Sequence, residues 1–211
     1  MRNIEVTEGK KMELRLATEG WKTHKNKPEC LPLCLYNILL DLSRSENYYE
    51  FLPFSVQILK TIAEYSSESG SSWSAAVRGI ESRLKRRKVK EWSLQSEEGK
   101  GIKQEKLCKI LSDENCSYPL VTLGPEYLSE RYKVPLEGHP HLRMDHCVIV
   151  LECGEEEIVI FDPYSPFDND SLPVIRLKKY TFERYWVASD PAKGVMWFQR
   201  MCQTLDKYMV K

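Results

Sequence analysis

The stretch THKNKPECLPLCLYNILLDL, residues 23–42, joins a polar, proline-marked segment to the longest apolar run of the chain. From Cys30 to Leu42 the run is apolar on nearly every side, which predicts a buried central helix. Pro32 has no backbone N–H to donate and fits best in a first helical turn, so the helix should begin within a residue or two of Cys30. A helix N-terminus favours the thiolate form of a cysteine. We therefore expect Cys30 to react and Cys34, one turn further in, to pack as a small hydrophobe.

The charge balance gives no reason to expect a polyanionic partner. The 211 residues include 31 Lys and Arg and 31 Asp and Glu, so nothing in the net charge favours nucleic acid or an anionic membrane surface. The first residues, MRNIEVTEGKK, are charged where a secretory signal needs an apolar core, and no apolar run approaches the ~20 residues that span a bilayer. Seven cysteines, several within apolar segments, suit reduced thiols better than a disulfide framework. We expect a cytoplasmic protein.

Helical patterns fill the first half of the chain, and strand patterns fill the second. Apolar residues recur with helical spacing in three further stretches, 54–65, 73–84 and 107–111. Four short runs rich in β-branched or aromatic residues follow: PLVTL at 119–123, CVIVLE at 147–152, EIVIFD at 157–162 and VMWFQRM at 195–201. This order predicts an α+β fold. We expect one domain over residues 1–211, with a helical lobe over about 21–115 and a β-sheet lobe over about 116–205.

Two residues suited to acid–base chemistry bracket the predicted hairpin. His146 opens the strand CVIVLE, and Asp162 closes the strand EIVIFD. Their separation, 162 minus 146, is 16, an even number, so with an odd-length loop or one bulge they should face each other directly across the strand pair. An imidazole so placed gives one ring N–H to the carboxylate and offers its other nitrogen to a thiol. We predict Cys30, His146 and Asp162 as catalytic residues.

Each of these residues also has a structural interpretation. Taken singly, Cys30 is more often a structural thiol, His146 a satisfied residue at a sheet edge, and Asp162 a turn former before proline. The segment GHPHLRMDHC adds His139 and His141, which raises the question of a metal ion. A proline separates these two histidines, and the chain has no C-x-x-C or H-E-x-x-H pattern, so the sequence argues against a metal site.

Both motifs resemble those of papain-like cysteine peptidases. The segment ECLPLCLYNIL is similar to the nucleophile region of that superfamily, most closely in the branch of bacteriocin leader-peptide processing peptidases, which read Cys-Gly-Pro before an apolar helix. The segment DHCVIVLECGEEEIVIFDPYSP is similar to the histidine strand, hairpin and closing Asp-Pro of the same branch. The resemblance implies a papain-like fold in which a central Cys-bearing helix packs on an antiparallel sheet. It also implies that Cys30 is the nucleophile, His146 the base and Asp162 the orienter.

Two positions depart from the family pattern. Leu31 replaces the usual glycine, and His24 stands six residues before the cysteine, where the family carries a glutamine whose amide helps to form the oxyanion hole. His24 and Asn26 are therefore the oxyanion candidates of this chain, and the loss of a good oxyanion donor costs ~100- to 1,000-fold in rate. These departures favour an alternative function, a catalytically silent papain-like domain that binds a peptide or protein partner.

The expected activity is hydrolysis of peptide or amide bonds through an acyl-enzyme. Its substrate would be a peptide or protein, and the chemistry needs no cofactor and no membrane. The same residues could pass the acyl group to an amine or thiol, so an acyltransferase stays open as a second alternative. The basic run RLKRRKVK, Arg83 to Lys90, is predicted to be a solvated helix end and is the only hint of a nucleic-acid partner.

Overall fold

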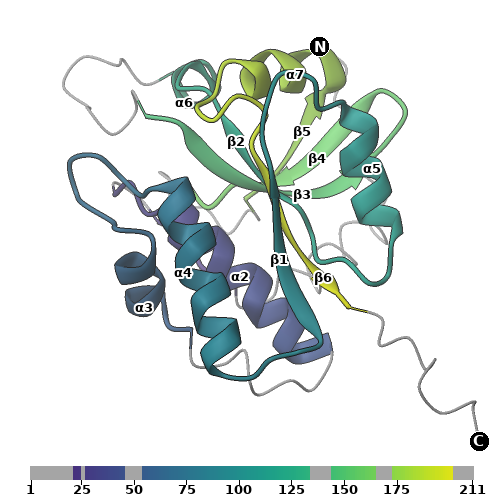
Figure 1. Cartoon of the computed structure of the whole chain (residues 1–211). Coiled ribbons are helices and arrows are strands. Elements are labelled where there is room, and N and C mark those ends of the chain that lie inside the picture. The colour runs from purple at the N-terminus through teal and green to yellow at the C-terminus, as the bar shows by residue number, and fades with distance from the viewer. Residues whose placement is uncertain (1–20, 25–26, 46–53, 134–143, 165–172, 202–211) are drawn as a thin grey trace, which may run out of the picture.

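The structure is a computed structural model that describes residues 21–24, 27–45, 54–133, 144–164 and 173–201 (Figure 1). The helices of this part of the chain are α2 (Cys30–Ser45), α3 (Val56–Ile62), α4 (Trp73–Arg86), α5 (Gln104–Ser112), α6 (Glu126–Tyr132) and α7 (Lys179–Val187). The strands are β1 (Trp92–Glu97), β2 (Leu120–Leu123), β3 (His146–Cys153), β4 (Glu157–Phe161), β5 (Val174–Lys178) and β6 (Val195–Arg200). The prediction of an α+β fold is confirmed.

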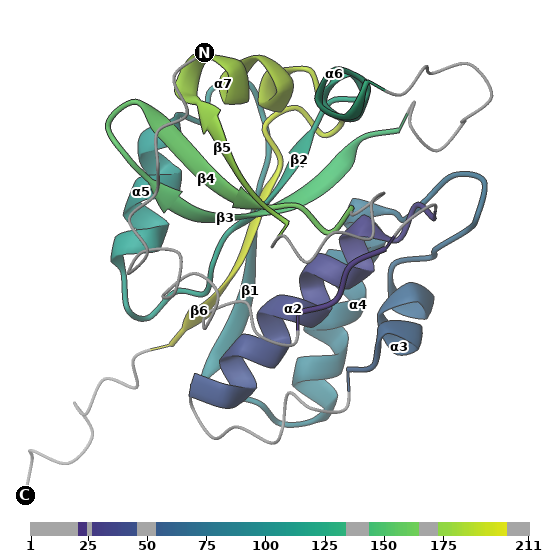
Figure 2. The ribbon, with the colours of Figure 1, turned by 180° about the vertical axis from the view of Figure 1, so that it is seen from behind.

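The strands form one twisted sheet in the order β1-β6-β2-β3-β4-β5, and neighbouring strands are antiparallel. Helices α2, α3 and α4 lie together on one side of the sheet, and α5, α6 and α7 lie around the other side (Figures 1 and 2). Strand β3 is central, so both of its faces are covered. Continuous apolar runs such as CVIVL are typical of strands buried on both faces.

Alternation along β3 divides the core into two parts. Cys147, Ile149 and Leu151 belong to the core that includes the buried residues of α2 and α4, whereas Val148 and Val150 belong to the core shared with α6 and α7. Successive side chains of a strand point to opposite faces, so one strand contributes to both cores. Packing on both faces fixes β3 between two layers of helices. His146, the first residue of this strand, therefore has little freedom to move.

The predicted start of the central helix is confirmed, because α2 begins at Cys30 with Pro32 in its first turn. The predicted hairpin is also confirmed as the pair β3 and β4. The expectation that His146 and Asp162 lie directly opposite each other is wrong. Ile149 pairs with Phe161, so the next residue, Asp162, continues opposite Val148, two residues from His146 on the same face. A register shift between Val150 and Glu152 accompanies this pairing, and the two side chains meet diagonally.

Strand β1 was not predicted, and it corrects the expectation that the first half of the chain is helical. It joins the edge of the sheet by pairing with β6, with Trp92 opposite Arg200 and Glu97 opposite Val195. Its sequence WSLQSE has only two buried residues, Trp92 and Leu94, which is a weak signal for a strand. The long-range partner in β6 therefore determines this strand more than its local sequence does.

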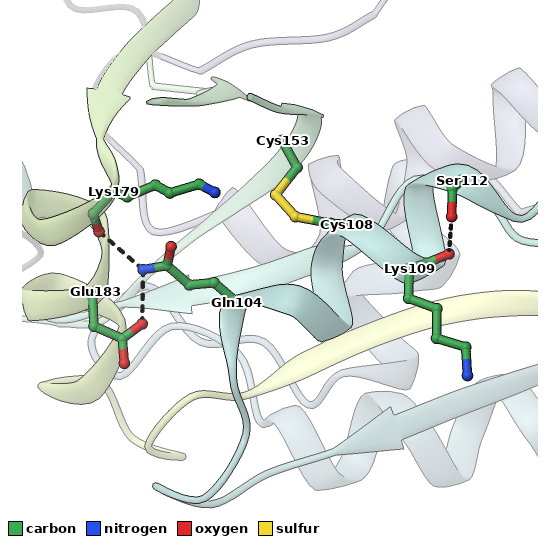
Figure 3. The surroundings of a disulfide bond; sticks show 7 residues. All are labelled: Gln104, Cys108, Lys109, Ser112, Cys153, Lys179 and Glu183. Atoms are coloured by element: carbon green, nitrogen blue, oxygen red, sulfur yellow. Dashed lines mark hydrogen bonds between the residues drawn. A yellow bond between two sulfur atoms is a disulfide. The ribbon is translucent and has the colours of Figure 1, made fainter. Parts of the chain in front are cut away.

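A disulfide bond between Cys108 of α5 and Cys153 at the end of β3 corrects the expectation of reduced thiols throughout (Figure 3). Their Cα atoms are 5.3 Å apart. Beside this bond, Gln104 donates hydrogen bonds of 2.9 Å to the Lys179 carbonyl and to the Glu183 carboxylate, which holds the start of α5 against α7. Because β3 rises about 3.3 Å per residue, the disulfide lies roughly 23 Å along the strand from His146.

The basic run closes α4, as predicted. The side chains of residues 85–88 are exposed, and the N–H of Arg87 caps the helix by donating to the carbonyls of Arg83 and Lys85. Val89 is buried, which ties the end of the run to the core. Among the described residues, no helix combines the length and the apolar character needed to cross a membrane.

Candidate active site

Cys30 lies at the N-terminus of α2, where the sequence and two contacts hold it. The Leu33 N–H donates to the Glu29 carbonyl at 3.0 Å and starts the helix at this point. The Glu29 carboxylate pairs with the Lys60 ammonium of α3 at 2.6 Å, which fixes the residue before the cysteine. The Cys30 side chain is 9% exposed and lines a pocket of about 190 Å³. This pocket therefore offers a small reagent or an extended chain a route to Cys30.

His146 and Asp162 form a buried ion pair at one end of the hairpin. The His146 Nε2 atom lies 2.6 Å from Asp162 Oδ1, and the two residues are 2% and 0% exposed. Because Nε2 is engaged by the carboxylate, Nδ1 is the ring nitrogen that remains for the Cys30 thiol, with which His146 shares a hydrogen bond. The three residues that the sequence predicted as catalytic are therefore brought together in the fold.

The electrostatics of this group favour a charged pair of thiolate and imidazolium. Burial opposes a charged imidazole, yet the attraction of the Asp162 carboxylate and the hydrogen bonds to Asp162 and Cys30 raise the pKa of His146 to about 10. The pKa of Cys30 is lowered well below its usual range by a hydrogen bond from the Cys147 thiol, against the effect of burial, and further by His146. Burial acts to raise the Asp162 pKa, but the His146 charge and the hydrogen bonds that the carboxylate accepts together lower it below its usual range. Both shifts favour the thiolate form of Cys30 and the imidazolium form of His146.

The other free thiols in the described part of the chain behave in the opposite way. Burial raises the pKa of Cys34 well above its usual range, and Cys34 is fully buried with its sulfur 3.4 Å from the Cys147 carbonyl. The Cys147 pKa is raised because its thiol donates to Cys30 and is buried. Burial also raises the pKa of Cys116 to about 11. Cys30 is therefore the one free thiol among the described residues with a lowered pKa, and Cys34 packs in the core as predicted.

His24 lies beside the ion pair, and two sets of hydrogen bonds hold its segment in place. The backbone N–H of His24 donates to the Pro163 carbonyl at 2.7 Å. The Asn37 side chain of α2 accepts a hydrogen bond from the backbone N–H of Lys22 and donates one to its carbonyl. The His24 ring centroid is 6.2 Å from that of His146, and neither His24 ring nitrogen has a hydrogen-bond partner among the described residues. Burial lowers the pKa of His24 to about 4, so the ring is neutral above pH 5 and keeps one N–H to donate. Asn26, the other oxyanion candidate, lies outside the described residues.

The pocket in front of Cys30 combines polar and apolar walls. His24, Cys30, His146 and Cys147 line it, together with residues 69–71 and Trp73. Leu31 also lines the pocket, although the residue is only 2% exposed. The leucine is thus largely packed in the core instead of filling the opening.

Three tyrosines complete the site, and sequence analysis missed them. The hydroxyls of Tyr127 and Tyr132 donate to Asp162 Oδ2 at 2.8 and 2.9 Å, and the Tyr164 N–H donates to Oδ1 at 2.8 Å. Tyr164 follows the Asp-Pro motif closely, so its nearness could have been expected. Nothing in the local pattern of α6 marks Tyr127 and Tyr132, because their role depends on how that helix packs against the hairpin.

Within the described residues, no group of three or more histidine, cysteine, aspartate or glutamate side chains has the arrangement of a metal site. His139 and His141, which raised the question of a metal ion, lie outside the described residues. The pocket thus brings together Cys30, His146 and Asp162, the residue types that cysteine-dependent acyl transfer requires.

Comparisons with known proteins address the fold. No protein-family model matches the chain, and no curated protein matches its sequence. A Bacillus anthracis protein assigned as a C39-like peptidase superposes with a TM-score of 0.54 at 11% identity, over 88% of this chain and 96% of that one. A double glycine motif protease from an AMS/PCAT transporter, solved with a leader peptide, gives 0.48 at 12% identity, over 85% and 89% of the two chains. The peptidase domain of Streptococcus ComA, a bifunctional ABC transporter, gives 0.47 at 14%, over 86% and 99%. The first match shows that the chain has the C39-like, papain-like fold that the sequence motifs implied.

Proposed function

We propose that this protein is a cysteine-dependent hydrolase that acts on peptide or amide bonds. The observation that carries the proposal is that Cys30 and His146 line one pocket and lie close enough to interact, with His146 held at 2.6 Å by Asp162. A thiol that only packs in a core has its pKa raised, as Cys34 does, whereas the pKa of Cys30 is lowered. This difference supports a reactive role for Cys30 over a structural one.

In the proposed reaction, the Cys30 thiolate attacks the carbonyl carbon of the scissile amide, and the carbonyl oxygen takes the negative charge. His146, as imidazolium, gives its proton to the leaving amine when the carbon–nitrogen bond breaks. The ring, now neutral, takes a proton from water as the water oxygen attacks the thioester carbonyl carbon. The carbon–sulfur bond then breaks, which releases the carboxylic acid and regenerates the Cys30 thiolate and the His146 imidazolium. Asp162 keeps the ring oriented and stabilises its charge through both steps.

We assign the oxyanion-stabilising donor to His24. Its ring nitrogens are buried without a partner among the described residues, and the ring lies beside His146 on the same pocket. A neutral imidazole has one N–H, so His24 can take the place of the family glutamine as a single donor. A donor of this kind contributes ~100- to 1,000-fold to the rate. The unusual residue at this position is thus compatible with activity, which weakens the case for a catalytically silent domain.

An acyl-transfer assay tests the proposal without knowledge of the natural substrate. With p-nitrophenyl acetate, the wild type should release a burst of nitrophenol equal to one acyl group per Cys30, and intact mass spectrometry should find the acetyl group on that residue. Cys30→Ala should abolish the burst, and Cys116→Ala, which removes a thiol with a raised pKa, should retain it.

Cleavage of a pooled library of synthetic peptides, read by mass spectrometry, then tests the amide-bond activity. We expect cleavage that depends on both Cys30 and His146. A wild type that neither shows the burst nor cleaves any peptide, but still binds peptides in the pocket, would contradict the proposal and support the silent domain. A transferred acyl group in the presence of an added amine would indicate the acyltransferase instead.

A further inference from the structure

The acceptor capacity of the Asp162 carboxylate is fully used. Oδ1 accepts from His146 Nε2 at 2.6 Å and from the Tyr164 N–H at 2.8 Å, and Oδ2 accepts from the hydroxyls of Tyr127 and Tyr132 at 2.8 and 2.9 Å. A carboxylate has about four lone-pair sites, so four donors saturate it. Protonation of either oxygen would displace a donor, and the buried donor would then lack a partner.

Both hydroxyl donors come from α6, which the sheet places behind the hairpin. Strand β2 ends at Leu123, directly opposite His146, and the chain turns at Gly124 into the helix. A Cβ atom at Gly124 would lie 2.9 Å from the Ala188 side chain, so glycine permits the close packing of this turn. The N–H of Tyr127 donates to the Gly124 carbonyl at 3.0 Å. The register of β2 with β3 therefore sets the position of α6 relative to His146.

Each tyrosine also makes a second contact that fixes its hydroxyl. The Tyr127 ring is fully buried and stacks on the His146 ring, with centroids 5.8 Å apart and planes 17° apart. The Tyr132 hydroxyl lies 3.1 Å from the Tyr164 carbonyl as well, and the two tyrosine rings meet edge to face at 5.0 Å. Burial and the Asp162 charge raise the pKa of both hydroxyls, so each stays protonated and remains a donor.

We propose that Tyr127 and Tyr132 are positioning residues that hold Asp162 as an oriented carboxylate behind His146, an inference that rests on the proposed function. A fully buried carboxyl without such donors favours its neutral form and would accept the His146 proton. The neutral pair would no longer stabilise the Cys30 thiolate. The two hydroxyls thus keep the negative charge on Asp162, the positive charge on His146 and, through them, the reactive form of the cysteine.

The pH dependence of this array reflects several neighbouring groups. Titratable side chains around Cys30, His146 and Asp162 come from several segments. They are His24, Asp145, Cys147 and Tyr164, together with Tyr127 and Tyr132 of α6. His24 has a pKa of about 4, and the Cys147 pKa is raised, so neither changes charge between pH 6 and 8. Burial raises the pKa of Asp145 to about 6, which makes the wild-type profile the necessary reference.

The test uses Tyr127→Phe, Tyr132→Phe and the double variant, which remove the hydroxyls and keep the rings. Tyr185→Phe is the matched control, because the Tyr185 hydroxyl donates to Glu130 at 2.8 Å in the same region and does not touch Asp162. Two readouts need no substrate: the pH profile of iodoacetamide alkylation at Cys30, and the titration of His146 by NMR of its ring nitrogens. Thermal unfolding reports any purely structural effect.

We expect each single variant to lower the alkylation rate at pH 6 about tenfold, as for loss of one hydrogen bond to a charged group, and to lower the His146 pKa. The double variant should lose more, and Tyr185→Phe should match the wild type. Variants that unfold at lower temperature but keep the wild-type pH profile and the wild-type His146 titration would overturn the inference. If the double variant fails to fold, the single Tyr132→Phe variant, altered at the last residue of α6, decides the question.

The His146 titration separates this inference from the proposed function. It can be measured in a Cys30→Ala background, where no catalysis is possible. A lowered His146 pKa in the tyrosine variants supports positioning even if wild-type Cys30 proves unreactive, which would contradict only the proposed function. An unchanged His146 pKa contradicts positioning even if the wild type cleaves peptides.

Discussion

Replacing His146 should remove most of the reactivity of Cys30 at acidic pH. In the wild type the charged His146 ring holds the cysteine as a thiolate, because its pKa of about 10 keeps the ring protonated over the whole physiological range. In His146→Ala the sulfur keeps the Cys147 hydrogen bond and stays buried, but it loses the hydrogen bond and the positive charge of His146, so the Cys30 pKa rises toward the ordinary range. The reactivity of the sulfur should then approach that of a common thiol.

The size of the effect follows from the fraction of thiolate. An ordinary thiol with a pKa of about 8.5 is only about 0.3% thiolate at pH 6, so a fully ionised Cys30 has about 300-fold more nucleophile. A thiolate of lower pKa is intrinsically less nucleophilic, and a Brønsted coefficient of 0.4–0.5 removes about tenfold of that advantage. The net prediction is that His146→Ala reduces the alkylation rate of Cys30 at pH 6 by about 30-fold.

The assay is iodoacetamide alkylation under pseudo-first-order conditions from pH 5 to 9, with the Cys30 peptide followed by mass spectrometry. His146→Gln serves as a second variant that retains side-chain bulk. Cys34 is an internal control for unfolding, because it is fully buried one turn further along α2 and should react slowly in every folded variant. Rates for wild type and both variants that agree within about threefold at pH 6 would refute the electrostatic argument.

Three further outcomes are expected. His24→Ala should lower the turnover rate ~100- to 1,000-fold with little effect on the alkylation rate of Cys30. His24→Gln, which supplies an amide donor, should retain activity, and a similar loss of turnover in both variants would contradict the oxyanion role. Asp41→Asn should raise the melting temperature by about 2–4 °C at pH 8 but not at pH 4. Burial raises the Asp41 pKa to about 6, so the charged carboxylate begins to destabilise the folded state as pH rises above the pKa of the unfolded chain, and the full destabilisation is reached above about pH 6. An equal change in melting temperature at both pH values would contradict this. Reduction of the disulfide between Cys108 and Cys153, which lie 45 residues apart in the chain, should lower the free energy of unfolding by about 4 kcal/mol in denaturant titrations. The alkylation rate of Cys30 should stay unchanged, and a slower alkylation would show that the disulfide affects the site.

Local patterns were enough to predict the parts of the site that lie at the ends of regular elements. Pro32 and the apolar run after it located the start of α2 and so placed Cys30 at a helix N-terminus. The paired strands placed His146 and Asp162 at one end of a hairpin, because neighbouring β-branched runs with a short loop have few other arrangements. The sequence could not supply the exact pairing, since a register shift within β3 changes which residues are opposite each other.

Features that depend on distant packing were not predicted. Strand β1 has few apolar residues and is fixed by pairing with β6, more than ninety positions away in the chain. Tyr127 and Tyr132 reach Asp162 only because α6 packs behind the hairpin. The Cys108–Cys153 bond likewise joins a helix and a strand whose nearness no local motif indicates. Such contacts are set by the tertiary fold and leave no signal in the spacing of residues.

The most direct test of the account is the ultraviolet absorbance of thiolate at 240 nm, titrated from pH 4 to 10 and compared between wild type and Cys30→Ala. We predict a difference of one thiolate at pH 6, already present well below the range in which ordinary thiols ionise, because His146 and Cys147 stabilise the Cys30 charge. A difference that appears only near pH 8.5 or above would show that Cys30 is an ordinary buried thiol and would contradict the proposed chemistry.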